Sequence, residues 1–171
     1  MAAPPQSIRS KADLDQLRKK LDESHGRACS NLKEILTEPH LLRRLKFEKL
    51  GCDPLNADEP ENLIEQVNQQ ATFEVALDAL DLLMTRHPDK EWKFAPGAWA
   101  DGPDIESTDK EVAAEVFAAV HPDNNKKLAK DIARATLTIA KHKYVIFRSP
   151  AKERSEWSAQ GLTVISLDFL A

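Results

Sequence analysis

One glutamate most constrains how this chain can fold. Glu115 lies in the middle of an almost wholly apolar run, from Val112 to Val120, that is typical of a strand inside a sheet. An ionised carboxylate among apolar groups is costly unless a charged partner or a metal ion lies beside it. The fold therefore has to bring a partner to Glu115.

Asp104 is the candidate partner, because strand pairing can bring it to Glu115. In an antiparallel hairpin, a four-residue loop from Thr108 to Glu111 places Asp104 directly opposite Glu115. A two-residue loop at Thr108 and Asp109 leaves the two acids on the same face, one diagonal apart, because side chains alternate along a strand. Both registers predict a carboxylate pair on one face of a sheet.

Such a pair has the chemistry of a metal site. Two carboxylates at this separation repel each other unless a proton or a cation lies between them. Mg²⁺ prefers oxygen ligands, so Asp104 and Glu115 predict a Mg²⁺ site in which Mn²⁺ could substitute. Two alternatives stay open. Glu115 could pair with a distant Arg or Lys, and placement of the two acids on opposite faces of the sheet would indicate an unrelated α/β enzyme.

Hydrophobic periodicity predicts the elements around this pair. Apolar residues at helical spacing predict two or three helices between about Ser10 and Leu50, and a long helix from Glu61 to Arg86. Three short strands then suggest a meander, and Asp123 is expected to cap a helix that runs to about Lys141. The other predicted elements are strands at 92–95, 103–107, 112–120, 144–147 and 162–167, with a short helix at 151–159.

Composition and the positions of helix-breaking residues predict the domain organisation. The breaker-rich segment from Gly51 to Asn56 separates an N-terminal helical extension, residues 1–59, from an α/β core, residues 60–171. Hydrophobic residues make up 42% of the chain and charged residues 30%, which is the balance of a globular protein with its own core.

Charge and targeting signals narrow the expected partners. The net charge of −4 argues against a protein that coats nucleic acid by bulk electrostatics, but a nuclease remains compatible with it. We find neither an export signal nor an apolar run of the ~20 residues that a membrane span needs, so the cytoplasm is the expected location and no membrane partner is expected. Cys29 and Cys52 are too far apart for a CxxC motif.

Several of these features together resemble a known family. Gly-Pro-Asp-Ile-Glu at 102–106, Ala-Glu-Val-Phe at 114–117, and the helix and strand that follow are similar to the PD-(D/E)xK nuclease superfamily, which has the restriction-endonuclease-like fold. The likeness runs from about Glu61 to the C-terminus. It implies an α/β core ordered helix, three-strand meander, helix, strand, short helix, strand. It also implies that Mg²⁺ is bound by Asp104, Glu115 and the backbone carbonyl of Val116.

The chain departs from the family at the motif lysine, which should follow two residues after the second acid, where this chain has Phe117. Some members take the lysine from the next helix. A helical wheel places Lys127 at the flank of that helix's apolar stripe, with Lys130 as the second choice. The alternative is that these lysines are solvated or contact phosphates at the surface.

Other acidic residues are candidates to complete the site. The resemblance implies that a Glu from the first core helix supports the metal, and Glu74 is the position to test. The alternative is a solvated acidic stripe of Glu74, Asp78 and Asp81, which share one helix face. By strand parity Glu106 shares the face of Asp104, whereas Asp101 is expected in a loop.

Two functional hypotheses follow. The first is a divalent-metal-dependent nuclease, with DNA as the expected substrate and restriction or defence as the setting that the family implies. The second is a catalytically inactive, nuclease-like binding or assembly module, which Phe117 and the acidic balance favour. A homodimer or a larger defence or repair complex would fit either hypothesis. The basic segment from Leu41 to Lys49 could contact nucleic acid phosphates, form an oligomer contact, or pack against the core.

Overall fold

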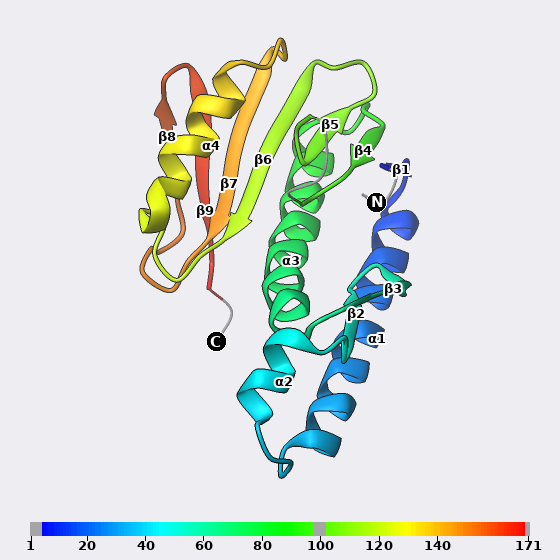
Figure 1. The fold of residues 1–171 in the computed structure, drawn as a ribbon. Helices are drawn as coiled ribbons and strands as arrows, with labels where there is room; N and C mark the ends of the chain where they lie inside the picture. Colours follow the sequence, from blue (N-terminus) through cyan, green and yellow to red (C-terminus); the bar gives the residue numbers. More distant parts are fainter. Residues whose placement is uncertain (1–4, 98–101, 170–171) are drawn as a thin grey trace. The chain divides into compact units, whose positions relative to one another are not determined.

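The computed structural model describes residues 5–97 and 102–169. Within these residues the chain is an α/β protein with four α-helices, a seven-stranded mixed sheet and a separate two-stranded hairpin (Figure 1). The described residues form two compact units, one of residues 12–74 and one of residues 5–11, 75–97 and 102–169. The boundary predicted after residue 59 divides the chain at a different place, and helix α3 has residues in both units.

The first unit, residues 12–74, is mainly helical, as predicted. The apolar spacing of α1 turns Leu14, Leu17 and Leu21 into one buried face. Its elements are α1 (Lys11–Ile35), α2 (Leu41–Phe47), the hairpin β2 (Gly51–Asp53) and β3 (Asn56–Glu61), and the first half of α3 (Leu63–Arg86).

The β2–β3 hairpin is not among the elements predicted from the sequence, because its turn-forming residues are also typical of a domain boundary. Asp53 makes the turn: its Oδ1 accepts the N–H groups of Leu55 and Asn56, both at 2.8 Å. An aspartate that bonds the backbone two and three residues ahead is a common turn device, so breaker residues here connect two strands.

The second unit contains the sheet, with strand order β1-β4-β5-β6-β7-β9-β8. Strands β4, β5 and β6 form the predicted antiparallel meander, and β7 and β9 add in parallel to β6. The bounds are β1 (Gln6–Ile8), β4 (Trp92–Phe94), β5 (Ile105–Ser107), β6 (Val112–Ala118), β7 (His142–Arg148), β8 (Ser155–Ala159) and β9 (Leu162–Leu167).

Helices contact both faces of this sheet. Helix α4 (Lys127–Thr136) connects β6 to β7 and packs through Leu128 and Ile132 on a buried cluster. That cluster comprises Phe117, Ala135, Val145, Phe147, Leu162 and Val164. Residues of β7 at alternate positions point to the opposite face, where Arg148 contacts Asp78 of α3 at 2.7 Å. Glu115 and Phe117 therefore lie on the α4 face.

The predicted end of the crossover helix is wrong. Helix α4 ends at Thr136 instead of continuing to Lys141. The hydroxyl of Thr136 donates to the carbonyl of Ala133 at 2.7 Å, and the hydroxyl of Thr138 donates to that of Ala135 at 3.0 Å. Hydroxyls that bond nearby carbonyls compete with continued helix formation, and this β-branched segment also has low helix propensity.

The predicted start of the same helix is also wrong. Residues 124–126 form a short 3₁₀ turn, η1 (Asn124–Lys126), and Asn125 and Lys126 have left-handed backbone angles. The α-helix proper therefore begins at Lys127, and Asp123 lies too early in the chain to cap it. Asparagine tolerates a left-handed conformation better than most residues, which favours a break at this point.

The short helix predicted at 151–159 is wrong, because Ser155–Ala159 forms the edge strand β8. Its residues alternate between half-buried and exposed, which is the period of a strand. Gln160 and Gly161 have φ angles of 50° and 79°, which suits a two-residue hairpin turn into β9.

Candidate functional site

The β5–β6 register brings the two predicted acids together. Ile105 lies opposite Ala114 and Glu106 opposite Ala113, which confirms the four-residue loop from Thr108 to Glu111. The Oδ2 atom of Asp104 accepts the backbone N–H of Val116 at 2.8 Å, next to Glu115. One arginine contacts both acids, so the two carboxylates share a face and do not point to opposite sides of the sheet.

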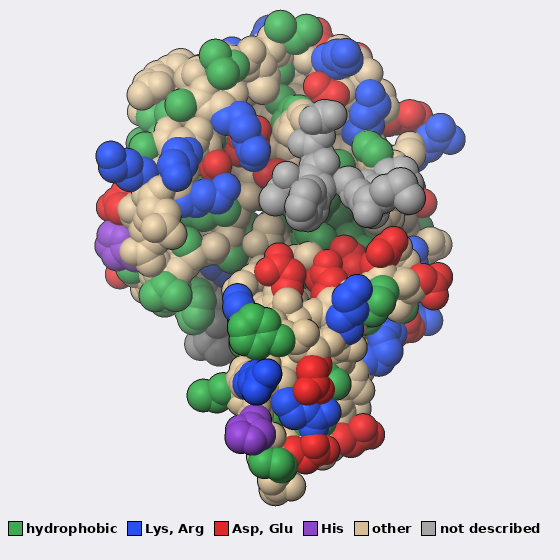
Figure 2. All heavy atoms as spheres, viewed as in Figure 1, with side chains coloured by type: hydrophobic (Ala, Val, Ile, Leu, Met, Phe, Trp, Pro, Cys, Tyr) green, Lys and Arg blue, Asp and Glu red, His purple; other side chains and the backbone are tan. Residues whose placement is uncertain are grey.

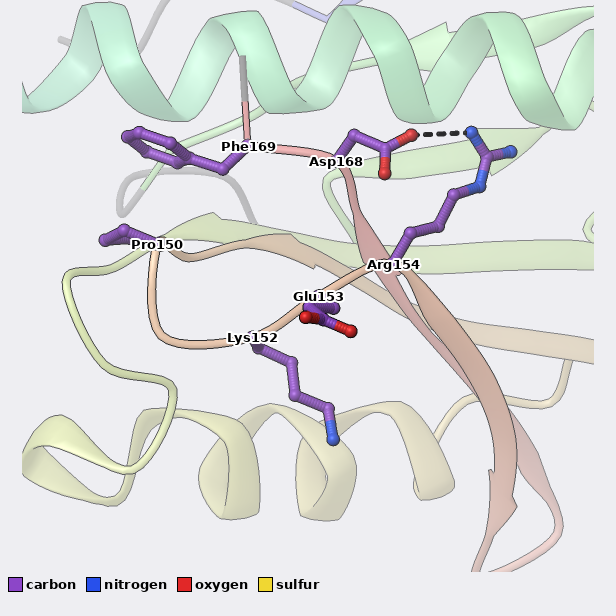
Figure 3. Close-up of a pocket in the computed structure, with 6 residues that line it drawn as sticks. All are labelled: Pro150, Lys152, Glu153, Arg154, Asp168 and Phe169. Atoms are coloured by element: carbon purple, nitrogen blue, oxygen red, sulfur yellow. Dashed lines mark hydrogen bonds and ion pairs between the residues drawn. The ribbon is translucent and has the colours of Figure 1, made fainter. Parts of the chain in front are cut away.

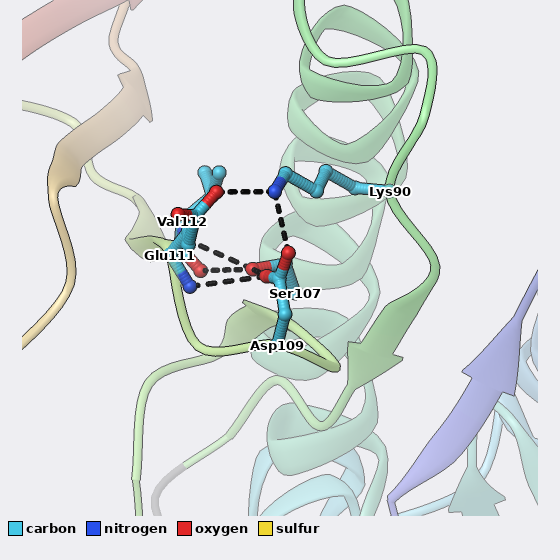
Figure 4. A network of polar contacts seen from close by, with 5 residues as sticks. All are labelled: Lys90, Ser107, Asp109, Glu111 and Val112. Carbon is cyan, nitrogen blue, oxygen red and sulfur yellow. Dashed lines mark hydrogen bonds and ion pairs between the residues drawn. The ribbon is translucent and has the colours of Figure 1, made fainter.

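A polar network in the hairpin loop holds this register (Figure 4). Asp109 accepts the Ser107 hydroxyl at 2.6 Å and the N–H of Glu111 at 3.1 Å, while Ser107 Oγ accepts the N–H of Val112 at 2.9 Å. The ammonium of Lys90 contacts the carboxylates of Asp109 and Glu111. The loop is thereby fixed between the two strands, and a one-residue slip that would turn Glu115 away is disfavoured.

Both acids of the pair are buried. Glu115 is 1% exposed and Asp104 is 4% exposed. Burial, with the charge of Asp104, raises the pKa of Glu115 to about 7. Burial also raises the pKa of Asp104, although the N–H groups of Val116 and Gly97 that donate to it oppose the rise. Near neutral pH the two carboxyl groups therefore hold a proton more readily than ordinary carboxylates do, although the charge of Arg134 opposes this.

The cation at the pair is Arg134, from the last turn of α4. Its Nη2 contacts Glu115 Oε2 and lies 3.8 Å from Asp104 Oδ2. The alternative partner of Glu115, a distant arginine, is therefore present in the structure, and Asp104 lies beside it.

Arg134 is not among the site residues predicted from the sequence, because the resemblance points to a lysine on this helix. A signal was available. Lys127, Asp131 and Arg134 fall at i, i+4 and i+7, so a wheel that included arginine would have placed all three on one helix face.

The predicted lysine, Lys127, lies over the ring of Phe117. Lys127 Nζ lies 5.5 Å from the centre of the Phe117 ring and 2.9 Å from the carboxylate of Asp131, which is 4% exposed. The Phe117 ring stacks on Phe147, with centroids 5.1 Å apart. Lys127 is thus positioned by a cation–π contact and an ion pair, whereas Lys130 is exposed on the helix.

The other predicted site residues have different surroundings. Glu74 lies in the helical unit, is exposed, and accepts the amide of Gln70 at 3.1 Å. Glu106 is half-buried and lies 4.0 Å from the ammonium of Lys93. Asp101 lies outside the described residues.

The donor set can be tested against a metal ion. Within residues 5–97 and 102–169, no three His, Cys, Asp or Glu side chains are grouped at metal-binding distances. Asp104 and Glu115 supply two hard carboxylates. Mg²⁺ is commonly held by one or two carboxylates, with waters and substrate phosphate oxygens completing its shell. The pair therefore fits such an ion.

The surface around α4 is cationic. Figure 2 shows Lys and Arg side chains gathered over α4, where the sequence has Lys126, Lys127, Lys130 and Arg134. Phosphate groups are bound by such side chains.

A hollow of about 440 Å³ lies at the carboxyl ends of β7 and β9, away from the predicted site residues (Figure 3). An ion pair between Arg154 and Asp168, at 2.9 Å, crosses its lining. The residues that line it are Pro150, Lys152, Glu153, Arg154, Asp168 and Phe169.

Comparisons with protein-family models, with curated proteins and with solved structures found no match to this chain. The described helices lack the combination of length and apolar character that crossing a bilayer requires. The fold and the site define the chain as an α/β protein with a mixed sheet and a buried acidic pair.

Proposed function

We propose that this chain is a divalent-metal-dependent nuclease that hydrolyses phosphodiester bonds, with DNA as the expected substrate. The observation that carries the proposal is the placement of Asp104 and Glu115 side by side on the α4 face of β5 and β6. Both are buried, and a cationic helix surface lies next to them. Buried acids of raised pKa are over-represented at functional sites.

In this proposal Asp104, Glu115 and the carbonyl of Val116 hold Mg²⁺ or Mn²⁺. Such an ion would neutralise charge on the scissile phosphate and lower the pKa of a bound water. Two backbone N–H groups, from Gly97 and Val116, orient the Asp104 carboxylate, so one ligand is preorganised before a cation arrives.

Lys127 is proposed to position the attacking water and to stabilise developing negative charge. Support comes from its place above Phe117, the position where the family has its lysine, and from Asp131, which fixes the ammonium. Lys130 is the second choice. Glu74 stays a prediction from the resemblance, since its described contact is to Gln70. Restriction or defence likewise stays a setting suggested by the family.

A second candidate is the inactive, nuclease-like binding module. Arg134 favours it, because its guanidinium satisfies the Glu115 carboxylate from within the chain. The buried Phe117 ring, stacked on Phe147, also stands at the strand position where the resemblance expects a lysine.

The test is cleavage of plasmid, linear and single-stranded DNA and of RNA, with Mg²⁺ or Mn²⁺ and with EDTA as the blank. Asp104→Asn and Glu115→Gln should lower the rate about 100-fold or more, since even outer partners of metal ligands are worth ~10–100-fold. Glu106→Gln is the matched control, because Glu106 follows Asp104 by two residues, on the same face, but lies 4.0 Å from Lys93. Circular dichroism confirms that each variant is folded.

The outcomes separate the two candidates. Cleavage that survives both Asp104→Asn and Glu115→Gln would contradict the assignment of the site. A folded wild type that neither cleaves nucleic acid nor binds Mn²⁺ favours the binding module.

A further inference from the structure

Arg134 occupies the place where a cation shared by the two acids would lie. Its Nη2 contacts Glu115 Oε2 and lies 3.8 Å from Asp104 Oδ2. A divalent ion bound by these oxygens and the guanidinium repel each other, so both cannot stay there.

The structure indicates which group would move. The side chain of Glu115 is 2% exposed and that of Asp104 is 6% exposed, whereas the Arg134 side chain is 49% exposed. Asp104 is also bonded by two backbone N–H groups. A half-exposed arginine recovers water contacts when it leaves a partner, while a buried carboxylate does not.

A second carboxylate lies on the same helix face as Arg134. Asp131 precedes it by three residues, a spacing at which helix side chains meet. Asp131 also binds the ammonium of Lys127 at 2.9 Å. Its carboxylate would attract a released Arg134 and keep it near the edge of the site.

We propose that Arg134 is the built-in counter-ion of the Asp104–Glu115 pair, and that a divalent cation binds by displacing it. This inference rests on the proposed metal site. Without metal, Arg134 partly neutralises the two carboxylates. The metal affinity is then set by competition with Arg134 as well as by the two acids. Removal of the guanidinium should then tighten metal binding, the opposite of the usual effect of changing a residue at a metal site.

The test measures Mn²⁺ affinity of the full chain by the electron paramagnetic resonance signal of free Mn²⁺. Arg134→Ala is expected to bind Mn²⁺ about tenfold more tightly than the wild type, the equivalent of one close charge pair. Lys141→Ala is the matched control, since Lys141 is an exposed cation that follows the same helix and has no part in the proposed site. It should change the affinity less than about twofold, because exposed charges are screened.

A second readout follows Arg134 directly. In ¹⁵N-labelled wild type, titration with diamagnetic Mg²⁺ should shift the Arg134 Nε–Hε resonance toward that of a solvated arginine and leave Arg154 unchanged. Assignment comes from the spectrum of Arg134→Ala, in which this resonance is missing.

Each outcome decides the inference independently of catalysis. An Arg134→Ala affinity equal to or weaker than that of the wild type overturns it. Equal tightening in Lys141→Ala also overturns it, because that result would reflect long-range charge. Absence of Mn²⁺ binding in both the wild type and Arg134→Ala also overturns it. If Arg134→Ala binds Mn²⁺ more tightly but the wild type cleaves no nucleic acid, the displacement of Arg134 is supported and the nuclease proposal fails. If the wild type cleaves but Arg134→Ala does not bind Mn²⁺ more tightly, the nuclease proposal stands and the displacement of Arg134 fails.

Discussion

Gly51 is a residue whose lack of a side chain is a packing requirement. An added Cβ would lie 2.2 Å from the Oε1 atom of Gln66. The Gln66 side chain is buried, and its amide joins two segments: it donates to Ser24 Oγ at 2.9 Å and accepts the N–H of Cys52 at 3.2 Å. Buried amides that lose such partners are costly.

Gly51→Ala should therefore lower the free energy of unfolding by about 1–3 kcal/mol, the cost of unpairing a buried polar group. Urea denaturation of the full chain measures it. Gly26→Ala is the control, because no described atom lies within 4 Å of a Cβ added there. In the interior of α1 that change should stabilise the chain by up to ~1 kcal/mol. A Gly51→Ala protein as stable as the wild type would contradict the described packing.

His87 predicts a pH dependence of stability. Burial is the main cause that lowers the pKa of His87 below its ordinary value of 6.5, and the charges of His142, Lys90 and Arg86 act in the same direction. Its Nε2 lies 3.0 Å from the Tyr144 hydroxyl. Because the folded state favours neutral His87, its contribution is present above the ordinary pKa and is lost as the pH falls below it.

The expected result is that the wild type loses more stability than His87→Gln when the pH falls from 7 to about 5. Urea denaturation at both pH values measures the difference, and other titrating groups cancel because they are common to the two proteins. Parallel losses in the two proteins would show that protonation of His87 is not linked to folding.

At the scale of residues, the acidic pair was predictable but its cation was not. Asp104 and Glu115 follow from hairpin geometry, since the two strands are close in sequence and a short loop sets their register. Arg134 reaches Glu115 from the far end of the crossover helix, so its contact depends on how α4 packs on the sheet. A periodicity argument gives the helix face of Arg134 but not its distance from the strand.

At the scale of elements, the loop between β5 and β6 determines whether the pair forms. Asp109 accepts hydrogen bonds from Ser107 and Glu111, and ion pairing with Lys90 lowers its pKa well below the usual value. Lys110 in the same loop has a φ angle of 61°, a left-handed conformation that favours glycine.

Substitutions of the neighbouring residues Asp109 and Lys110 should therefore change the stability of the protein in opposite directions. Asp109→Ala removes the acceptor and should lower the melting temperature, whereas Lys110→Gly relieves a left-handed backbone and should raise stability by about 1 kcal/mol. Calorimetry measures both. If Asp109→Ala melted like the wild type while Mn²⁺ affinity also stayed unchanged, the loop network would have no part in holding the register.

The elements that sequence analysis missed or extended too far have weak or misleading hydrophobic patterns. Strand β8 is short and half-polar, so its period was weak, and the decisive signal was the Gln160-Gly161 turn. Helix α4 was overextended because Ile139 continues the apolar spacing, yet Ile139 is 87% exposed. The long helix α3 and the central strands had strong patterns, and these predictions were confirmed.

At the scale of the whole molecule, burial is unevenly distributed. Six of the seven residues of β6 are buried, whereas every residue of α2 is exposed or half-buried. Hydrogen exchange should therefore be slowest in β6 and β7 and fastest in α2, since local opening is easiest where little apolar surface is lost. Mass-spectrometric exchange measures this, and protection of α2 equal to that of β6 would mean that α2 is covered in solution.

The pairing of β1 with β4 has a consequence for the order of folding. Gln6 lies opposite Phe94 and Ile8 opposite Trp92, so nearly the first half of the chain separates the two strands. Closing so long a loop has an entropic cost that the nearby β5–β6 and β8–β9 hairpins do not have, and contacts of this kind form late. During synthesis, Ile8 leaves the ribosome well before Trp92 and Phe94. Strand β1 therefore has no partner strand until β4 has been synthesised.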